Sequence, residues 1–310
     1  RLEKALREKS EEFDSVIKMG RTQLQDAVPI RLGQEFHAYA SAISRDIKRF
    51  DTAKEEIRSL NMGGTAIGTG LNADSTYFHR VVKNMSSITG EELVQSYDTI
   101  DATQNLDSYA MVSGIVKSCA VNLSKMCNDL RLMSSGPRTG FCEINLPAKQ
   151  NGSSIMPGKI NPVIPEVVNQ VAFNIIGNDV TITMAAEAGQ LELNAFEPII
   201  FYNLFESIQT LSNAVQTLVD NCIVGITANE EHCRKMVEGS IGIITAICPY
   251  VGYETAANIA KEALRTNNSV RDLILQKKLL TEEQLKTILD PYTMTKPGIQ
   301  GRNPADLLAD

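Results

Sequence analysis

The sequence is poor in several residue types, and each shortage narrows the class of protein. It has no Trp, and its three histidines, His37, His79 and His232, are scattered rather than grouped as metal ligands. It contains no run of about 18 apolar residues, so no segment is predicted to span a membrane. Lys and Arg total 30 against 37 Asp and Glu, and a net charge of −7 disfavours sequence-independent nucleic-acid binding. We therefore expect neither a membrane nor a nucleic acid as partner, and no metal site.

The six cysteines include no CxxC pair. Four of them, Cys119, Cys127, Cys222 and Cys248, stand among apolar residues, which is typical of buried, reduced thiols. No signal-peptide pattern opens the sequence. Together these observations predict a cytoplasmic protein.

Strand patterns are nearly absent, whereas long helical patterns are frequent. Apolar residues recur every three or four positions over residues 32–60, 101–133, 166–186 and 201–222. This spacing predicts an all-α fold built on a long-helix bundle. The helix expected at 101–133 is apolar around most of its circumference, so neighbouring helices, including those of other subunits, are expected to cover it.

Residues 1–18 also fit a helix, with Leu2, Ala5, Leu6, Phe13, Val16 and Ile17 on one apolar face. No Ser, Thr, Asp or Asn caps its first turn, and no initiator Met precedes it. We expect the chain to be a piece of a longer protein.

Proline and glycine are unevenly distributed. Five of the 11 prolines and four glycines fall in residues 134–166, which predicts a long loop between two helices, and loops of that length are usually functional. After about residue 228 the helical patterns shorten. We predict a central helical-bundle domain over residues 1–228, which includes the loop at 134–166, and a small helical C-terminal domain over residues 229–310.

The strongest motif is the run GSSIMPGKINP at residues 152–162, inside this loop. It offers two hydroxyls, backbone N–H groups beside glycines, one ammonium and one amide. These groups could hold a small carboxylate while a hydroxyl faces the adjacent carbon. The alternative, from the pattern alone, is a surface loop that carries an incidental Lys.

The run closely resembles the signature GSSxMPxKxNP of the aspartase/fumarase superfamily of lyases. Residues 20–29 (GRTQLQDAVP) and 64–72 (GTAIGTGLN) are similar to two further segments of that superfamily, in the same order. The resemblance implies the L-aspartase-like fold, with the N-terminal domain of the family absent. It also implies that the glycine-rich segment 64–70 is a tight connection bordering the site. That segment is no phosphate loop, because it lacks the GK[ST] ending and a preceding strand.

Within the superfamily, residues 163–171 (VIPEVVNQV) resemble the ammonia-lyases that act on aspartate, whereas class II fumarases have TQCE there. Gln23 favours the same group, since fumarases have His at that place. The resemblance implies a carbon-nitrogen lyase that converts L-aspartate reversibly to fumarate and ammonia through an aci-carboxylate intermediate. The alternatives are a class II fumarase, or a non-catalytic helical assembly module like the lens crystallins of the superfamily.

The resemblance also implies a role for each residue of the site. Ser153 is expected to be the general base that removes the Cβ proton, acting as an alkoxide. The expected substrate-binding residues are Thr22, Lys159 and Asn161 for the α-carboxylate, Ser154 for the β-carboxylate, Gln23 for the amino group or a water near it, and Met156 beside the substrate or anchoring the loop. Glu166 is a candidate supporting residue, although a carboxylate at the start of a helix is better explained by capping alone. In relatives with His in place of Gln23 the equivalent Glu pairs with that His, which Gln23 cannot reproduce.

Further implications concern the assembly. The family needs no cofactor, and Mg²⁺ activation is known within it, but no residue pattern here identifies a metal site. The family forms homotetramers whose active sites combine segments from three subunits. Because the N-terminal segments that contact substrate are absent, we expect the chain alone to have little activity.

Overall fold

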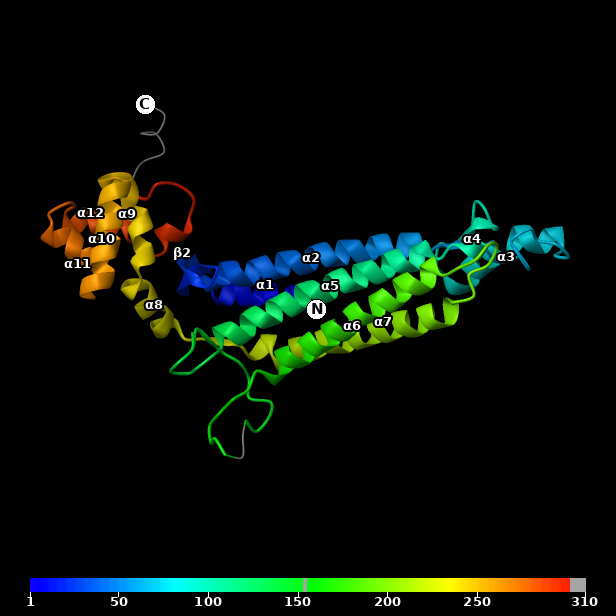
Figure 1. Ribbon diagram of the computed structural model, residues 1–310, viewed down its shortest axis with the longest axis horizontal. Helices are drawn as coiled ribbons and strands as arrows, with labels where there is room; N and C mark the ends of the chain where they lie inside the picture. Colours follow the sequence, from blue (N-terminus) through cyan, green and yellow to red (C-terminus); the bar gives the residue numbers. More distant parts are fainter. Residues whose placement is uncertain (153–154, 302–310) are drawn as a thin grey trace, which may run out of the picture. The chain divides into compact units, whose positions relative to one another are not determined.

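The computed structural model describes residues 1–152 and 155–301, and the chain divides into two compact units. The first unit comprises residues 1–3, 41–131 and 148–222, and the second comprises residues 4–40, 132–147 and 223–310. Helices dominate both units, which confirms the predicted all-α class (Figure 1). No helix in the described part of the chain is both long and apolar enough to cross a membrane.

Helices make up most of the first unit. They are α3 (Ser75–Thr89), the short α4 (Asp101–Gln104), α6 (Val163–Glu187), α7 (Glu197–Asn221), and the parts of α2 (Leu32–Glu56) and α5 (Asp107–Met133) that fall in it. In Figure 1, α5, α6 and α7 run beside the second half of α2. Apolar side chains from all four helices meet in one core, which includes Ala53, Val112, Ile182 and Leu204. A short parallel pair, β3 (Ser59–Leu60) with β4 (Val94–Gln95), lies beyond the end of α2.

The helix boundaries follow local chemistry. Pro165 lies in the first turn of α6, where its missing N–H has no intrahelical acceptor to lose. Asp74 caps α3 by accepting hydrogen bonds from the N–H groups of Thr76 and Tyr77. The helix predicted at 101–133 is interrupted, because Asn105 is extended (φ −105°, ψ 132°) and separates α4 from α5.

Buried polar contacts link the bundle helices at several levels. On α6, the carboxylate of Asp179 accepts a hydrogen bond from Ser113 Oγ (2.8 Å) and pairs with Lys117, both on α5. Asn122 Nδ2 on α5 lies 2.9 Å from Asp46 Oδ2 on α2. Since a buried polar group must keep its partner, these contacts fix how the helices are aligned along their axes.

The second unit begins differently from the prediction. Helix α1 (Leu2–Glu12) ends well before residue 18, and β1 (Ile17–Thr22) then pairs antiparallel with β2 (Gln25–Arg31). The prediction of a helix over residues 1–18 was therefore wrong beyond Glu12. A short apolar run such as residues 16–19 fits a helix or a strand, and pairing with β2 decided the outcome.

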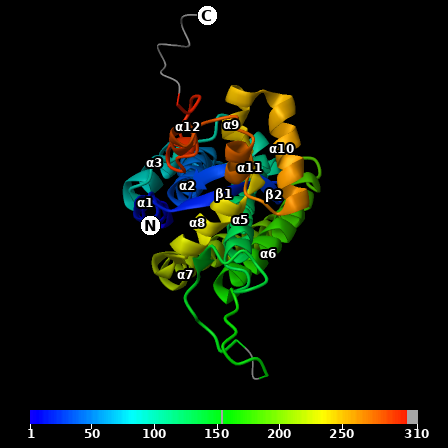
Figure 2. The same ribbon diagram turned by 90° about the vertical axis from the view of Figure 1, so that its left-hand side faces the viewer.

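Short helices complete the second unit. They are α8 (Glu230–Gly239), α9 (Ile244–Val251), α10 (Tyr253–Thr266), α11 (Val270–Gln276) and α12 (Glu282–Ile288), with 3₁₀ turns at Ile223–Gly225, Ile241–Ile243 and Thr293–Thr295. A two-stranded sheet joins β5 (Ile144–Asn145) to β6 (Thr227–Ala228). Met19 of β1 packs into the core formed by α8 to α12, and β1 contacts α8 (Figure 2). The domain division at residues 228 and 229 stays a prediction.

Three of the four cysteines predicted to be buried are buried, and Cys233 is buried in place of Cys248. Cys119, Cys127 and Cys222 are buried free thiols, as predicted. Cys248 on α9 is only half-buried, whereas Cys233 is buried against the loop that precedes β5. Burial raises the pKa of Cys119, Cys222 and Cys233 to about 12 and also raises that of Cys127.

The Asp179 contacts predict a specific loss of stability. Replacing Asp179→Ala leaves the buried hydroxyl of Ser113 without its acceptor, so we expect the free energy of unfolding to fall by about 1–3 kcal/mol. Urea unfolding followed by circular dichroism measures this difference. The control is the substitution of the exposed Asp51→Ala on α2, and equal stabilities of the two variants would contradict the role given to Asp179.

The thiol pKa values predict the order of alkylation. With a pKa near 12, a thiol is almost entirely protonated at pH 8 and reacts slowly. We expect iodoacetamide to label the half-buried Cys142 and Cys248 first and to spare the four buried cysteines until the protein is unfolded. Peptide mass spectrometry reads the order, and rapid native labelling of Cys119 or Cys127 would refute it.

Candidate functional site

The first candidate segment is the tip of the β1–β2 hairpin. Thr22 pairs with Gln25, so Gln23 and Leu24 form a two-residue turn. Both have left-handed backbone angles, with φ of 53° and 63°. Hairpin turns of this geometry favour Asn and Gly, so Gln followed by Leu is a strained choice. Such strain persists where the surrounding structure enforces it, and it is frequent at functional sites.

The tip is open to solvent. Thr22, Gln23 and Gln25 are exposed, and Leu24 keeps 63% of its surface accessible. The side chains of the two predicted substrate residues are therefore available to a ligand. The burial of apolar surface therefore does not explain why a Leu occupies this strained turn.

A bulge bends the hairpin just before the tip. The strand register shifts between Met19 and Arg21, at Gly20. A Cβ atom at Gly20 would lie 2.6 Å from the carbonyl oxygen of Val28, so only Gly fits there. Beyond the bulge, Arg21 faces Asp26 across the hairpin.

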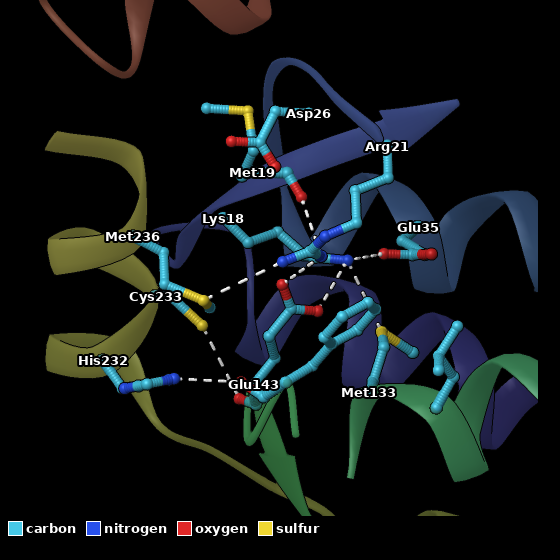
Figure 3. Close-up of polar contacts among 12 residues, drawn as sticks. Lys18, Met19, Arg21, Asp26, Glu35, Met133, Glu143, His232, Cys233 and Met236 are labelled. Atoms are coloured by element: carbon cyan, nitrogen blue, oxygen red, sulfur yellow. Dashed lines mark hydrogen bonds and ion pairs between the residues drawn. The ribbon is translucent and has the colours of Figure 1, made fainter. Parts of the chain in front are cut away.

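A buried charged cluster holds the base of this tip (Figure 3). The carboxylate of Glu143, which has no exposed surface, accepts a hydrogen bond from Arg21 Nη1 at 2.6 Å and lies 2.9 Å from Lys18 Nζ. Lys18 Nζ also lies 2.8 Å from the carboxylate of Glu35 on α2. Burial alone would lower the pKa of Lys18, but the two carboxylates outweigh it and leave that pKa above its usual value.

Backbone hydrogen bonds fix Glu143 in turn. Its N–H donates to the carbonyl of Met133 (2.8 Å), and its carbonyl accepts from the N–H of Asn229 (2.9 Å). The Arg21 guanidinium also stacks on the ring of Phe141, 4.0 Å from its centroid. Sequence reasoning missed this cluster. The available signal was a Glu between Phe141–Cys142 and Ile144, an apolar setting in which a charge needs partners.

The second candidate segment is the loop that carries the GSSIMPGKINP run, between β5 and α6. Asn161 Nδ2 donates to the carbonyl of Gly152 at 3.0 Å and so closes the loop on itself. A Cβ atom at Gly152 would lie 1.5 Å from the carbonyl oxygen of Lys159, so the two strands of the loop touch there. Lys159 and Met156 are exposed. Ser153 and Ser154 lie outside the described residues.

Glu166 lies in the first turn of α6, where a carboxylate suits the helix dipole. Its Oε1 is 3.7 Å from Arg131 Nη2 on α5, an ion pair with both side chains about 40% exposed. These contacts explain Glu166 structurally. The supporting role stays a prediction.

The predicted site residues thus fall in both units. Thr22 and Gln23 belong to the second unit, and Met156, Lys159, Asn161 and Glu166 belong to the first. The structure brings Thr22 and Gln23 together at one turn, and it brings Asn161 to the loop residues around Gly152. In the glycine-rich segment 64–70, Gly68 (φ 94°) lies so close to Thr99 and Ile100 that a side chain would collide with their backbone, as expected for a tight connection.

Outside these segments, the described residues offer an apolar cavity but no group of metal ligands. A cavity of about 310 Å³ in the first unit is lined mainly by apolar side chains of α2, α5 and α7 and includes none of the predicted site residues. Over residues 1–152 and 155–301, no three His, Cys, Asp or Glu side chains gather as metal ligands.

Comparison with known proteins agrees with the sequence resemblance. The family model described as "Lyase" matches residues 1–177, more than half of the chain. A second model, "Fumarase C C-terminus", matches residues 243–296. Both matches cover segments that the structure places in the units described above.

Curated relatives named aspartate ammonia-lyase match almost the whole chain. The protein from Bacillus subtilis (strain 168) is 57% identical over 296 residues, which is 96% of this chain and 62% of that protein. The one from Helicobacter pylori (strain ATCC 700392 / 26695) is 55% identical, over 96% of this chain and 63% of its own length. The chain therefore spans less than two thirds of the length of these relatives.

Solved structures show the same fold. The crystal structure of fumarate lyase:delta crystallin from Brucella melitensis bound to cobalt is 50% identical, with a TM-score of 0.92 over 96% of this chain and 64% of that chain. The recombinant class II fumarase from Schistosoma mansoni is 33% identical, with a TM-score of 0.90 over 96% of this chain and 65% of that chain. On the family models, the curated relatives and these structures, the chain belongs to the aspartase/fumarase superfamily of lyases.

Proposed function

We propose that the protein is an aspartate ammonia-lyase, which converts L-aspartate to fumarate and ammonia. The observation that carries this proposal is the identity of 51–57% with relatives of that name over nearly all of the chain. Gln23 supports the same choice, because it stands at the exposed hairpin tip where the fumarase resemblance would require His. The class II fumarase among the solved structures is less similar, at 33% identity.

The reaction has two bond-breaking steps. The base first removes a proton from Cβ of aspartate, and the electron pair moves into the adjacent β-carboxylate, which becomes a doubly charged aci-carboxylate. The pair then returns to form the Cα–Cβ double bond, and the protonated amine leaves as ammonia. Because charge accumulates on the β-carboxylate only in the middle of the reaction, donors fixed on its oxygens accelerate the reaction rather than merely binding substrate.

Ser153 is the proposed base, acting as an alkoxide. A free Ser hydroxyl is far too weak an acid for this role, so the site must stabilise the alkoxide with backbone N–H groups and positive charge. The neighbouring loop offers both, since the exposed Gly158 leaves backbone accessible and the exposed Lys159 supplies a cation. The proton taken by Ser153 passes to ammonia or solvent when the alkoxide is restored.

The remaining residues are proposed to hold the substrate. Lys159, Asn161 and Thr22 bind the α-carboxylate, and Ser154 donates to the β-carboxylate. Gln23 contacts the amino group, and Met156 packs beside the substrate or anchors the loop. Because Asn161 Nδ2 now donates to the carbonyl of Gly152, substrate binding exchanges one hydrogen bond for another.

The assembly is proposed from the same family membership. We expect a cytoplasmic homotetramer in which each site takes segments from more than one subunit, so that Thr22 and Ser153 of one site come from different chains. This chemistry requires no cofactor, and the role proposed for Mg²⁺ is that of an activator rather than of the base or acid.

The choice of substrate is the first test. A full-length version of the protein, given L-aspartate or L-malate separately, is expected to release fumarate from L-aspartate and not from L-malate. The ultraviolet absorbance of fumarate measures both reactions. Turnover of L-malate alone would indicate a class II fumarase, and turnover of neither would favour an assembly module.

The base is tested by Ser153→Ala in the same full-length protein. Loss of a general base is expected to lower kcat by about 100- to 10,000-fold with the fold unchanged by circular dichroism. The control is Ser87→Ala, which changes an exposed serine on α3. Retained turnover in the Ser153 variant would remove it as the base.

A further inference from the structure

We propose that Glu143 is a positioning residue that holds the strained Gln23–Leu24 turn and the adjacent Thr22 in the geometry needed to bind substrate. The inference rests on the proposed function for its effect on catalysis, whereas the clamp itself rests on contacts within the second unit. Glu143 belongs to none of the motifs that carry the family resemblance.

The contact chain from Glu143 to the site is short. Arg21 directly precedes Thr22, and its guanidinium is fixed on several sides: by Glu143 Oε1 at 2.6 Å, by the Phe141 ring at 4.0 Å and by the carbonyl of Met19 at 3.3 Å. A guanidinium held in this way leaves the backbone of Arg21 little freedom. The position of Thr22 follows from that of Arg21.

The opposite strand is fixed at the same level. Arg21 faces Asp26 across the hairpin, and Ser240 Oγ donates to Asp26 Oδ2 at 2.7 Å. Both residues of the pair below the turn are therefore tied to groups outside the hairpin. Two consecutive non-glycine residues with positive φ are expensive to hold, and such strain persists only when the surroundings over-determine the backbone.

Electrostatics single out Glu143 within the cluster. It is the carboxylate shared by both cations, Lys18 and Arg21, and all three side chains are at least 87% buried. Glu35 pairs with Lys18 and accepts a hydrogen bond from Tyr39, and neither of these described contacts involves Arg21. Removing the charge of Glu143 leaves Arg21 buried without its carboxylate partner. Because a buried unpaired charge is costly, we expect the guanidinium to move toward solvent and to displace the backbone of β1.

Glu143 also stands where the loop to the signature run begins. It immediately precedes β5, and its backbone is bonded to Met133 and Asn229. The side chain therefore ties the hairpin to the residues just before β5, as the close-up shows (Figure 3). A carboxylate in this place can hold the hairpin, which is proposed to bind substrate, without touching substrate itself.

The test compares two isosteric changes, Glu143→Gln and Glu35→Gln, in the full-length protein. Each removes one carboxylate charge from the cluster, but only the first removes the partner of Arg21. For Glu143→Gln we expect kcat/KM for L-aspartate to fall about 100-fold, mainly through a higher KM, because Thr22 and Gln23 move. For Glu35→Gln we expect kcat and KM near wild type, even where its melting temperature falls equally.

Hydrogen–deuterium exchange gives a readout independent of turnover. We expect faster exchange of the amides of residues 20–26 in Glu143→Gln, and wild-type exchange there in Glu35→Gln. If the wild-type protein does not act on L-aspartate, the proposed function fails, and this exchange pattern still decides whether the clamp exists.

Several results would overturn the proposal. They are unchanged hairpin exchange in Glu143→Gln, unchanged KM and kcat despite faster exchange, or equal kinetic losses in Glu35→Gln. Should Glu143→Gln fail to fold, Arg21→Lys is the second variant, since it keeps the charge but loses the fixed planar contacts with Glu143 and Phe141. Wild-type KM and hairpin exchange in Arg21→Lys would then overturn the proposal.

Discussion

The second unit depends on the burial of one carboxylate between two cations. Glu143 is fully enclosed, and it is tolerable there only because Lys18 and Arg21 reach it from β1. Glu143 lies more than 120 positions from both cations in the sequence, so the ion cluster joins two parts of the chain that no local rule connects. The hairpin is therefore held from its base, while its tip stays exposed and strained.

Buried polar contacts also organise the first unit, where they align long helices. The apolar faces of its long helices would allow them to pack with many different shifts along their axes. The buried polar contacts of Asp46 and Asp179 select one of these alignments. An apolar core supplies most of the free energy, whereas these polar contacts select one alignment.

Much of the fold could be predicted from the sequence because long helices repeat their apolar pattern many times. Residues 163–187 and 197–221 are helical almost as predicted. The hairpin was missed because the apolar run at residues 16–19 is too short to distinguish a strand from a helix. Only the pairing with residues 25–31 shows that it is a strand. The motif predicted the loop residues, but the Glu143 cluster depends on contacts between distant segments, which periodicity does not encode. Cys233 was missed for the same reason, since a neighbouring loop rather than its own helix covers it.

The contact between Gly152 and Lys159 adds a different constraint to the signature run. A side chain at residue 152 would occupy the space of a backbone carbonyl, so the first glycine is required by shape rather than by mobility. The hydroxyls and the ammonium of the same run are required by chemistry. A protein could therefore keep every reacting group of the run and still lose the site through a single added methyl group.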